Sequence, residues 1–434
     1  MISSVAIKQG LFRFAEIIHL RIFGHEMGEE MRIFLMNLSI IFIGSFFSSG
    51  ILFLVNILGG RLLGPAEYGK FQVMISIAQF LVIPMLLGLS TASVKHIAEA
   101  ETHEEKSLII KTATVSFSVF TLCSVIILFS LKEYFSRLFG VQLNFFLYSV
   151  ALAVLLGTFN ISRSFLQGLK KMKEISLLDF LYSLVIFLSF FFLLKLLKGY
   201  DSLYYAYLSG YVFFSSFALF LSLNKKTIIF DVSIFKKITH YGLYAIFGSA
   251  AGLLIGNIDK LILNKYYSAE SVGIYSAYLI ASTVVFAQIM QIVITVFFPT
   301  VSSINDKSVI IKKLNRLEAP IFILSTIASM VLISFSLKIM GAKFVLNGFY
   351  LTAFAINAGV VAAYQLKMWM LNSEGLRGVS ITVKGAIGIG IINFFICLIL
   401  IPKFAIYGAS ISLLTANIFL YYYFSYQLKK MYLC

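Results

Sequence analysis

Charged residues are scarce in this sequence. They make up only 12 % of the 434 residues, Asp and Glu together number 19, and there are 5 Pro and 1 Trp. Soluble domains carry about a quarter of their residues charged, so a water-soluble globular protein is excluded. With 60 % hydrophobic residues, 44 Phe and a mean hydropathy of +0.94, the chain needs a lipid bilayer as its solvent.

Patterns that bind a metal, a nucleotide or a disulfide framework are also missing. The 3 Cys have no metal-ligand spacing. No Walker phosphate loop or nucleophile elbow occurs, and His25-Glu26 and His103-Glu104 lack a second His at the spacing of a zinc site. We therefore expect no metal, no cofactor and no ATP hydrolysis. Energy would come from an H⁺ or Na⁺ gradient, the membrane potential or a substrate gradient, among which the sequence does not choose.

The net charge of +16 raises the question of nucleic-acid binding. Lys and Arg do not form a basic block within a soluble fold. They occupy short segments between apolar runs, where they act as signals of membrane topology. We expect no nucleic-acid partner, and the lipid bilayer as the surroundings of the chain.

Apolar runs long enough to cross about 30 Å of hydrocarbon recur along the chain. An even number of crossings puts both termini on one side of the membrane. The segments on that side carry about twice as many Lys and Arg as the opposite ones, which predicts cytoplasmic termini. The opposite connections are short, so no extracytoplasmic catalytic domain is expected. The twelve runs are 34–58, 70–92, 108–130, 142–165, 176–197, 203–223, 241–263, 274–299, 319–339, 345–370, 379–401 and 405–427.

An internal repeat relates the two halves of the chain. Gly44-Ser45 matches Gly248-Ser249, and Gly69 with Phe71 matches Gly273 with Tyr275, each pair being 204 residues apart (248 − 44 and 273 − 69). The same offset carries the fifth and sixth runs onto the eleventh and twelfth. The repeat predicts an all-α integral membrane protein with two six-helix lobes in parallel repeat about a pseudo-twofold axis. Transporters built in this way bind substrate between the lobes and alternate access by rocking.

The expected organisation follows from these runs. Residues 1–31 form a cytoplasmic amphipathic segment, residues 32–224 the first lobe, and residues 241–434 the second lobe. Residues 225–240, which include paired lysines, form a cytoplasmic linker.

Short motifs between the runs resemble those of one transporter family. Residues 61–71 read RLLGPAEYGKF and contain Arg61, Gly64, Pro65 and Gly69. They resemble the R-x-LGP-x-x-YG-x-F signature of the polysaccharide-exporting branch of the multidrug/oligosaccharidyl-lipid/polysaccharide (MOP) exporter superfamily. Pro fixes φ and Gly adopts angles forbidden to other residues, so we interpret this segment first as a helical-hairpin turn, ahead of a direct substrate role.

The second half repeats the theme. NIDKLIL at 257–263 is followed by VGIYS, which contains Gly273, and later by IP and IYGAS, which contain Pro402 and Gly408. These elements are similar to those of the same family, in the same order, from about residue 32 onward.

The resemblance implies a MATE-like (MOP) fold and a function. Wzx-like members translocate undecaprenyl-pyrophosphate-linked oligosaccharide, an O-antigen or capsule repeat unit, from the cytoplasmic to the periplasmic leaflet of the cell inner membrane. It also implies that a polysaccharide polymerase and chain-length machinery are partners. A lipid II flippase of the superfamily usually has two additional helices, which favours surface-polysaccharide units here.

A lipid-linked diphosphate calls for cations in a polar cleft. Lys260 and Asp259 are the leading candidates, because they lie about one turn inside the outer end of the seventh run, where an unpaired charge is costly. Adjacent helical residues diverge by about 100°, so the two cannot face one way. The further candidates for lining the cleft are Arg163, Lys367, Lys384, Gln288 and Gln291.

Plainer roles stand beside these. Each long cation can reach the nearer membrane interface. Asp179 lies in the first turn of the fifth run, where the helix dipole favours a carboxylate. Lys367 lies close to Tyr364 and Trp369, which suits an interfacial aromatic anchor slightly better than a sugar-stacking site.

Two alternative functions remain open at this point. One is an ion-coupled multidrug exporter of the same superfamily, although the first run, 34–58, has no Asp or Glu. The other is a membrane glycan polymerase or ligase, for which a sizeable outer loop would be expected.

Overall fold

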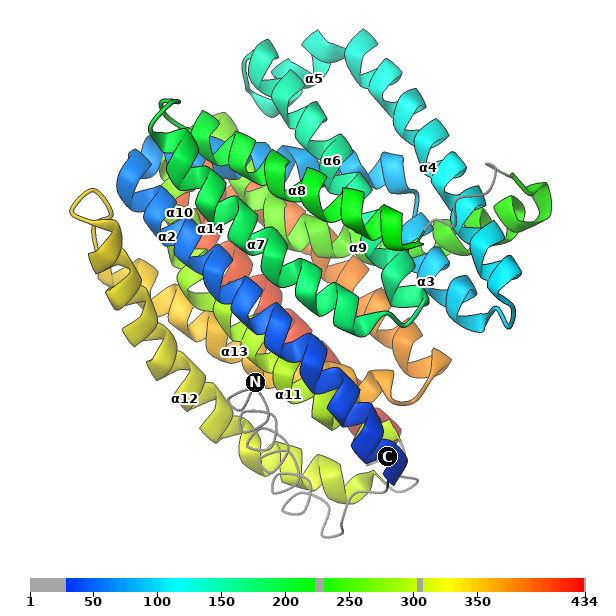
Figure 1. The fold of residues 1–434 in the computed structure, drawn as a ribbon. Coiled ribbons are helices and arrows are strands. Elements are labelled where there is room, and N and C mark those ends of the chain that lie inside the picture. The colour runs from blue at the N-terminus through cyan, green and yellow to red at the C-terminus, as the bar shows by residue number, and fades with distance from the viewer. Residues whose placement is uncertain (1–28, 223–229, 303–306, 433–434) are drawn as a thin grey trace, which may run out of the picture.

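The computed structural model describes residues 29–222, 230–302 and 307–432, and all their regular elements are helices (Figure 1). The first lobe contains α2 Glu29–Leu86, α3 Leu89–Glu99, α4 His103–Ser130, α5 Lys132–Phe139, α6 Leu143–Gly168, α7 Met172–Leu194 and α8 Asp201–Ser222. The second lobe contains α9 Val232–Tyr266, α10 Ala269–Leu279, the π-helical turn η1 Ile280–Val284, α11 Val285–Ser302, α12 Ser308–Met340, α13 Gly348–Asn372 and α14 Leu376–Tyr432.

Helix α2 is a hairpin of two crossings. At Gly64 the backbone leaves the helical region (φ 80°, ψ 169°), which glycine allows without strain. The side chain of Gln72 then donates a hydrogen bond of 3.0 Å to Oδ1 of Asn56. Sixteen residues of straight helix would separate these two by about 24 Å, so the chain must reverse between them.

Helix α14 is built in the same way. Its backbone is non-helical at Ala405 (φ 47°, ψ −126°), three residues after Pro402. A Cβ added to Gly408 would lie 2.4 Å from the carbonyl oxygen of Leu400, so glycine lets the two limbs approach closely. Their far ends also meet, since Tyr423 Oη donates to the carbonyl oxygen of Ile381.

These reversals settle the number of crossings in the described part of the chain. Nine helical stretches are long and apolar enough to span a bilayer, and two of them, Gly44–Leu86 and Arg377–Tyr432, contain the reversals and so cross twice. Helix α9, with 35 residues, carries the seventh predicted run. The predicted all-α architecture of about twelve crossings is confirmed, and the chain is a multi-pass membrane protein.

Helix α9 begins earlier than the apolar run that predicted it. Asp231 accepts a hydrogen bond of 2.8 Å from the backbone N–H of Ile234 and so caps a helix that starts at Val232. The expected linker 225–240 is therefore helical from 232 onward, whereas its residues 225–229 lie outside the described part. So does the expected N-terminal segment 1–31, apart from its last three residues, which begin α2.

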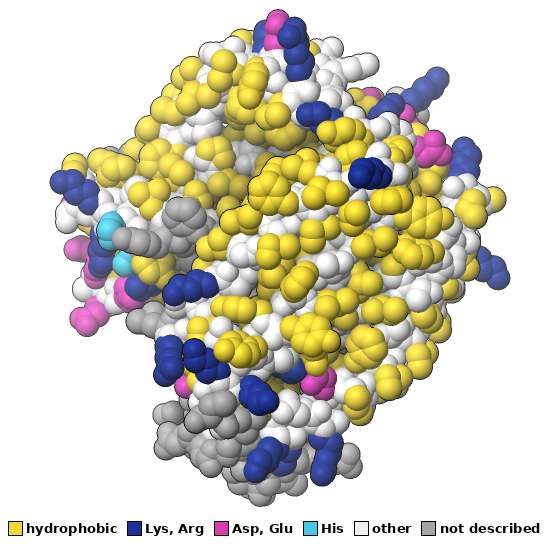
Figure 2. Space-filling model, turned by 180° about the vertical axis from the view of Figure 1, so that it is seen from behind, with side chains coloured by type: hydrophobic (Ala, Val, Ile, Leu, Met, Phe, Trp, Pro, Cys, Tyr) yellow, Lys and Arg dark blue, Asp and Glu magenta, His cyan; other side chains and the backbone are white. Residues whose placement is uncertain are grey.

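The surface of the molecule is a broad apolar belt. Figure 2 shows hydrophobic side chains covering the middle of one face, with Lys and Arg gathered toward its two ends. Large side chains point outward along this belt, among them Phe220, Leu324 and Val331. An apolar surface between two charged rims fits a protein surrounded by acyl chains.

Candidate functional site

The two lobes meet tightly at the end of the molecule that carries Gly64. A Cβ on Gly69 would lie 1.7 Å from the carbonyl oxygen of Ala269, and one on Gly273 would lie 2.0 Å from that of Pro65. Gly69 and Gly273 are the repeat-related glycines of the two motifs, so the repeat brings them face to face. Only residues without a side chain permit this backbone contact between α2 and α10.

Further contacts between the lobes close this end. Arg61, which is exposed, donates a hydrogen bond of 3.1 Å from its guanidinium to the carbonyl oxygen of Ile339 at the end of α12. The rings of Tyr68 and Phe344 meet edge to face with 6.5 Å between their centroids. Arg61, Gly64, Pro65 and Gly69 thus belong to the closed junction between the lobes.

Polar side chains join the lobes deeper in the membrane. Ser76 Oγ donates to Asn257 Oδ1 at 3.3 Å, and Asn257 Nδ2 donates to Gln79 Oε1 at 2.7 Å. Ser76 and Gln79 lie on α2 and Asn257 on α9, so these bonds cross between the lobes. Hydrogen bonds of this kind hold transmembrane helices together without a charge.

The lobes also touch at the opposite end of α9, toward the chain termini. The helical conformation is interrupted between α2 and α3 at Leu87 and Gly88, which both have positive φ. A Cβ on Gly88 would lie 2.0 Å from the carbonyl oxygen of Gly242 in α9. The ring of His96 packs against that of Tyr241. Helices α2 and α3 therefore contact α9 along most of its length.

Asp259 lies inside the second lobe. It is 1 % exposed, and its carboxylate accepts a hydrogen bond from the hydroxyl of Tyr275 and one of 2.8 Å from the backbone N–H of Lys260. The repeat-related positions of the first lobe, Val55 and Phe71, are equally buried but apolar. The second lobe thus holds an acid where the first lobe holds a valine.

Lys260 differs from every other buried lysine in the described residues. It is 8 % exposed, and its ammonium makes no hydrogen bond or ion pair with any residue that the structure describes. Gly252 and Gly256 precede it at a spacing of four, which places all three on one face of α9. A Cβ on either glycine would meet no atom within 4 Å, so this face of α9 is open at the two glycines and becomes buried at Lys260.

Arg163 forms an ion pair with Asp179, a residue for which the sequence predicted a separate role at the start of its own helix. Its guanidinium donates to both carboxylate oxygens of Asp179 in α7, at 2.8 and 3.3 Å, and Ser45 Oγ of α2 donates to the same carboxylate at 3.3 Å. Asp179 is buried, whereas 37 % of the Arg163 side chain is exposed. The pair joins α6, α7 and α2, and the Arg163 side chain stays partly exposed.

Lys367 is neutralised within the second lobe. Its ammonium lies 2.7 Å from Glu318 Oε1 and 2.8 Å from Ser425 Oγ, and 4.2 Å from the centre of the Tyr421 ring. Glu318 could not be linked to Lys367 from the sequence, because it lies 49 residues away on α12. The buried ion pair leaves little of the charge of Lys367 for a ligand.

The remaining candidate residues lie on other helices than Lys260 and Asp259. Lys384 is exposed on α14, and Gln288 is exposed on α11. Gln291 lies on α11, but its side chain is outside the described residues. Pro402 and Gly408 belong to the reversal of α14 and Gly273 to the junction with Gly69. In residues 29–222, 230–302 and 307–432 no three His, Cys, Asp or Glu side chains converge as metal ligands would.

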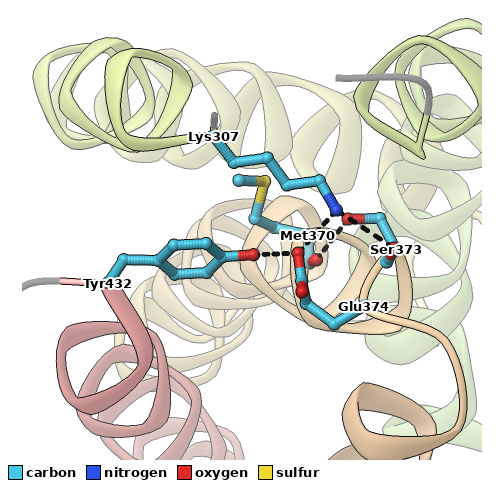
Figure 3. Close-up of polar contacts among 5 residues, drawn as sticks. All are labelled: Lys307, Met370, Ser373, Glu374 and Tyr432. Carbon is cyan, nitrogen blue, oxygen red and sulfur yellow. Dashed lines mark hydrogen bonds and ion pairs between the residues drawn. The ribbon is translucent and has the colours of Figure 1, made fainter. Parts of the chain in front are cut away.

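A polar cluster that sequence reasoning missed ties three helix ends together (Figure 3). Lys307, which precedes α12, donates to Glu374 Oε1 at 2.5 Å and to the carbonyl oxygen of Ser373 at 3.1 Å. The hydroxyl of Tyr432, the last residue of α14, donates to the same carboxylate. Burial alone would raise the pKa of Glu374, but these hydrogen bonds and the charges of Lys307 and Arg377 outweigh it and lower that pKa.

The fold matches solved structures of transporters. A lipid II flippase, MurJ, in an inward closed conformation superimposes with a TM-score of 0.65, at 16 % identity, over 90 % of this chain and 87 % of that one. An inward-facing multidrug resistance MATE family transporter of the MOP superfamily gives a TM-score of 0.60, at 14 % identity, over 91 % of this chain and 97 % of that one. The expected MATE-like (MOP) fold is confirmed.

Sequence comparison is more specific. A curated protein of Haloferax volcanii, the probable low-salt glycan biosynthesis flippase Agl15, is 25 % identical over 391 residues, which cover 86 % of this chain and 78 % of that protein. The family model described as "Polysaccharide biosynthesis protein" matches residues 34–305, more than half of the chain. With the glycine motifs in place at the lobe junction, we conclude that the chain belongs to the polysaccharide biosynthesis protein family.

Proposed function

We propose that the protein flips an undecaprenyl-pyrophosphate-linked oligosaccharide, an O-antigen or capsule repeat unit, from the cytoplasmic to the periplasmic leaflet of the inner membrane. Membership in the polysaccharide biosynthesis family, the similarity to a glycan flippase and the two-lobed transporter fold support this proposal. The observation that carries it is the buried ammonium of Lys260 on α9, which has no hydrogen bond or ion pair among the described residues.

An unpaired charge in a transmembrane helix costs several kcal/mol. A structural lysine would find a carboxylate, as Lys367 finds Glu318. Lys260 instead follows two glycines, on the same face of α9, that border open space, and in this proposal its partner is an anion that reaches it from there. A diphosphate offers several charged oxygens to such an ammonium.

The other candidate cations have smaller parts in this proposal. Lys367 is bound to Glu318 and Lys384 lies on the surface. Arg163, whose side chain is partly exposed beside Asp179, lies toward the opposite end of the membrane from Lys260, and in this proposal it contacts the diphosphate at a different stage of transport. Gln288, an exposed amide in a membrane-crossing helix, fits a wet surface that hydrogen-bonds sugar hydroxyls.

Transport follows an alternating-access cycle in this proposal. The junction of Gly69 with Gly273 seals one end, and substrate enters from the other. Rocking of the lobes separates the glycines and releases the glycan on the opposite side. The undecaprenyl chain stays in the bilayer, because moving its apolar surface out of the acyl chains into water would be unfavourable.

Coupling to an H⁺ or Na⁺ gradient has a candidate group in Asp259. A carboxylate buried without a bound cation among the described residues is destabilising, and a proton or a sodium ion removes that cost. Because Asp259 adjoins Lys260 in sequence, ion binding and substrate binding would act on the same turn of α9. Reconstituted flipping should then depend on the pH or sodium gradient and lose that dependence in Asp259→Asn.

The test of flipping uses purified protein in liposomes with an undecaprenyl-diphosphate oligosaccharide, whose exposure is read by a membrane-impermeant lectin. We predict that Lys260→Ala lowers the rate at least tenfold, since it removes a charge-assisted contact worth about 1.5–3 kcal/mol. Lys260→Arg should keep most of the activity. Lys265→Ala, at the exposed end of the same helix, is the matched control and should flip normally.

Other results would overturn the assignment. Absence of flipping by the unaltered protein with every glycan tested, together with export of a cationic dye, would favour the multidrug exporter. Lengthening of glycan chains by the protein alone would favour a polymerase or ligase. Co-purification with a polymerase or chain-length protein tests the proposed partners separately.

A further inference from the structure

One end of the second lobe carries a cluster of surface cations. The starts of α12 and α14 and the end of α14 meet there, held together by Lys307, Glu374 and Tyr432 (Figure 3). Their apolar sides pack into one buried cluster that includes Ile311 and Leu428. Exposed on the outer sides of these same turns are Lys312, Arg316, Arg377, Lys429 and Lys430, which we call the basic surface.

The carboxylates at this end of the lobe are already engaged. Among the described residues here, Glu374 is bound to the buried Lys307 at 2.5 Å and Glu318 to the buried Lys367 at 2.7 Å. Arg377 adds its charge beside Glu374, but no ion pair with a carboxylate is formed by Lys312 or Arg316 in the described part. Among the described residues, the cations of the basic surface are therefore not balanced by free carboxylates.

The corresponding end of the first lobe is different. There Lys95 pairs with Glu99, and Glu101, Glu104, Glu105 and Glu174 alternate with the lysines. A topology signal alone needs cations in the short loops of either lobe. It does not explain why acids balance these cations in the described part of the first lobe but not in that of the second, so the imbalance points to an anionic partner of the second lobe.

The depth of the basic surface identifies the kind of partner. On α12, Lys312 and Arg316 directly precede a stripe of exposed apolar side chains that starts at Leu317 and continues through Leu324, which is 68 % exposed. The cations therefore lie at the border of the apolar surface, which is the level of the lipid headgroups. On α14, Tyr426 is 62 % exposed one turn before Lys429 and Lys430, as in the aromatic belts of membrane interfaces.

We propose that the basic surface binds the phosphodiester headgroups of anionic phospholipids. Its cations lie at headgroup level on helices whose next turns face lipid, so a phospholipid satisfies both the charge and the apolar stripe. A soluble acidic protein would satisfy the charge alone. Bound lipids would hold the second lobe in its leaflet while the first lobe moves against it.

The test measures lipids retained by the full-length protein. Protein is reconstituted in vesicles of phosphatidylcholine with a minor fraction of phosphatidylglycerol, extracted gently, and the ratio of the two bound lipids is measured by mass spectrometry. The unaltered protein should be enriched in phosphatidylglycerol. Combined Lys312→Gln, Arg316→Gln, Lys429→Gln and Lys430→Gln should lower the enrichment about tenfold or more, since each cation near an anionic surface contributes about a fivefold factor.

The matched control removes as many cations from the first lobe. Combined Lys106→Gln, Lys111→Gln, Lys170→Gln and Lys173→Gln should leave the enrichment unchanged, and exchange of Lys and Arg within the basic surface should preserve it. An equal loss in both quadruple variants would overturn the proposal as a general charge effect. It would also be overturned if the basic-surface variant, with an unchanged melting temperature, kept its enrichment but lost a co-purifying acidic protein.

Discussion

At the scale of single residues, the repeat is most informative where its halves differ. Val55 and Phe71 of the first lobe correspond to Asp259 and Tyr275 of the second, and all four are buried. The tyrosine hydroxyl supplies a donor that the aspartate needs. Polar groups have thus been placed in one lobe at positions where the other lobe shows that apolar side chains also fit.

This comparison makes a stability prediction. Tyr275→Phe should destabilise the protein by about 1–3 kcal/mol, because it leaves a buried carboxylate without one of its donors. Asp259→Val with Tyr275→Phe restores the pair found in the first lobe, so the double variant should be at least as stable as Tyr275→Phe alone. Melting temperatures in detergent measure both, and exposed Tyr422→Phe is the control.

A double variant that proves less stable than Tyr275→Phe would show that Asp259 contributes more than its bond to the tyrosine. The same protein in the flipping assay separates stability from function. If Asp259 couples an ion, the double variant should fold well and lose gradient dependence.

At the scale of helices, polar clusters connect helix ends whose positions the pattern of apolar residues does not determine. Lys307, Glu374 and Tyr432 connect the start of α12, the turn before α14 and the end of α14. Lys171 caps the end of α8 in the first lobe by donating to the carbonyl oxygen of Leu221. Helix ends have unpaired carbonyls and N–H groups, so such contacts fix how each helix enters the membrane interface.

The cluster at Glu374 predicts a pH dependence. The pKa of Glu374 is lowered in the fold, so its ionised form stabilises the protein at pH values above the ordinary value of 4.5. This contribution is lost as the pH falls from there through the lowered pKa. Melting temperatures measured over this range should therefore fall more steeply for the unaltered protein than for Glu374→Gln.

The control for this series is Glu104→Gln, which removes an exposed carboxylate at the start of α4. The melting temperature of this variant should fall with decreasing pH as steeply as that of the unaltered protein. If the melting temperatures of Glu374→Gln and the unaltered protein fell equally with decreasing pH, the cluster would not contribute to the acid sensitivity of the fold.

At the scale of the whole molecule, the two lobes are closed against each other at the Gly64 end. The contact is made by backbone, since Gly69 and Gly273 leave no room for a side chain. Beside this backbone contact, the lobes are joined here by the rings of Tyr68 and Phe344 and by the hydrogen bond from Arg61 to Ile339. Opening of the junction in the proposed transport cycle would break these side-chain contacts as well.

Gly273→Val should force this junction apart, because a Cβ there would lie 2.0 Å from a backbone oxygen. Spin labels on Leu62→Cys and Val345→Cys, both exposed at this end, would report a longer distance between the lobes by electron paramagnetic resonance. Gly348→Val is the control, since a Cβ there meets no atom within 4 Å. An unchanged distance in Gly273→Val would mean that the lobes move as one body.

The sequence by itself determined the number of crossings, the repeat and the family. Each membrane-spanning helix can be predicted separately from its apolar run, because each helix in lipid must satisfy its own backbone hydrogen bonds and face hydrocarbon. The turn at Gly64-Pro65 could be predicted for the same local reason. The offset of 204 residues matched Gly69 with Gly273 as equivalent positions, and the structure shows that they touch.

Only the tertiary structure decided which charges are paired. Arg163 meets Asp179 across two helices, Lys367 meets Glu318 from 49 residues away, and Lys260 meets no described partner. In sequence these cations look alike, since each lies in an apolar run with no acid at helical spacing on its own face. Which helices pack together determines whether a charge is neutralised within the protein or left for a ligand, because ion pairing depends on a distance of a few ångströms between distant parts of the chain.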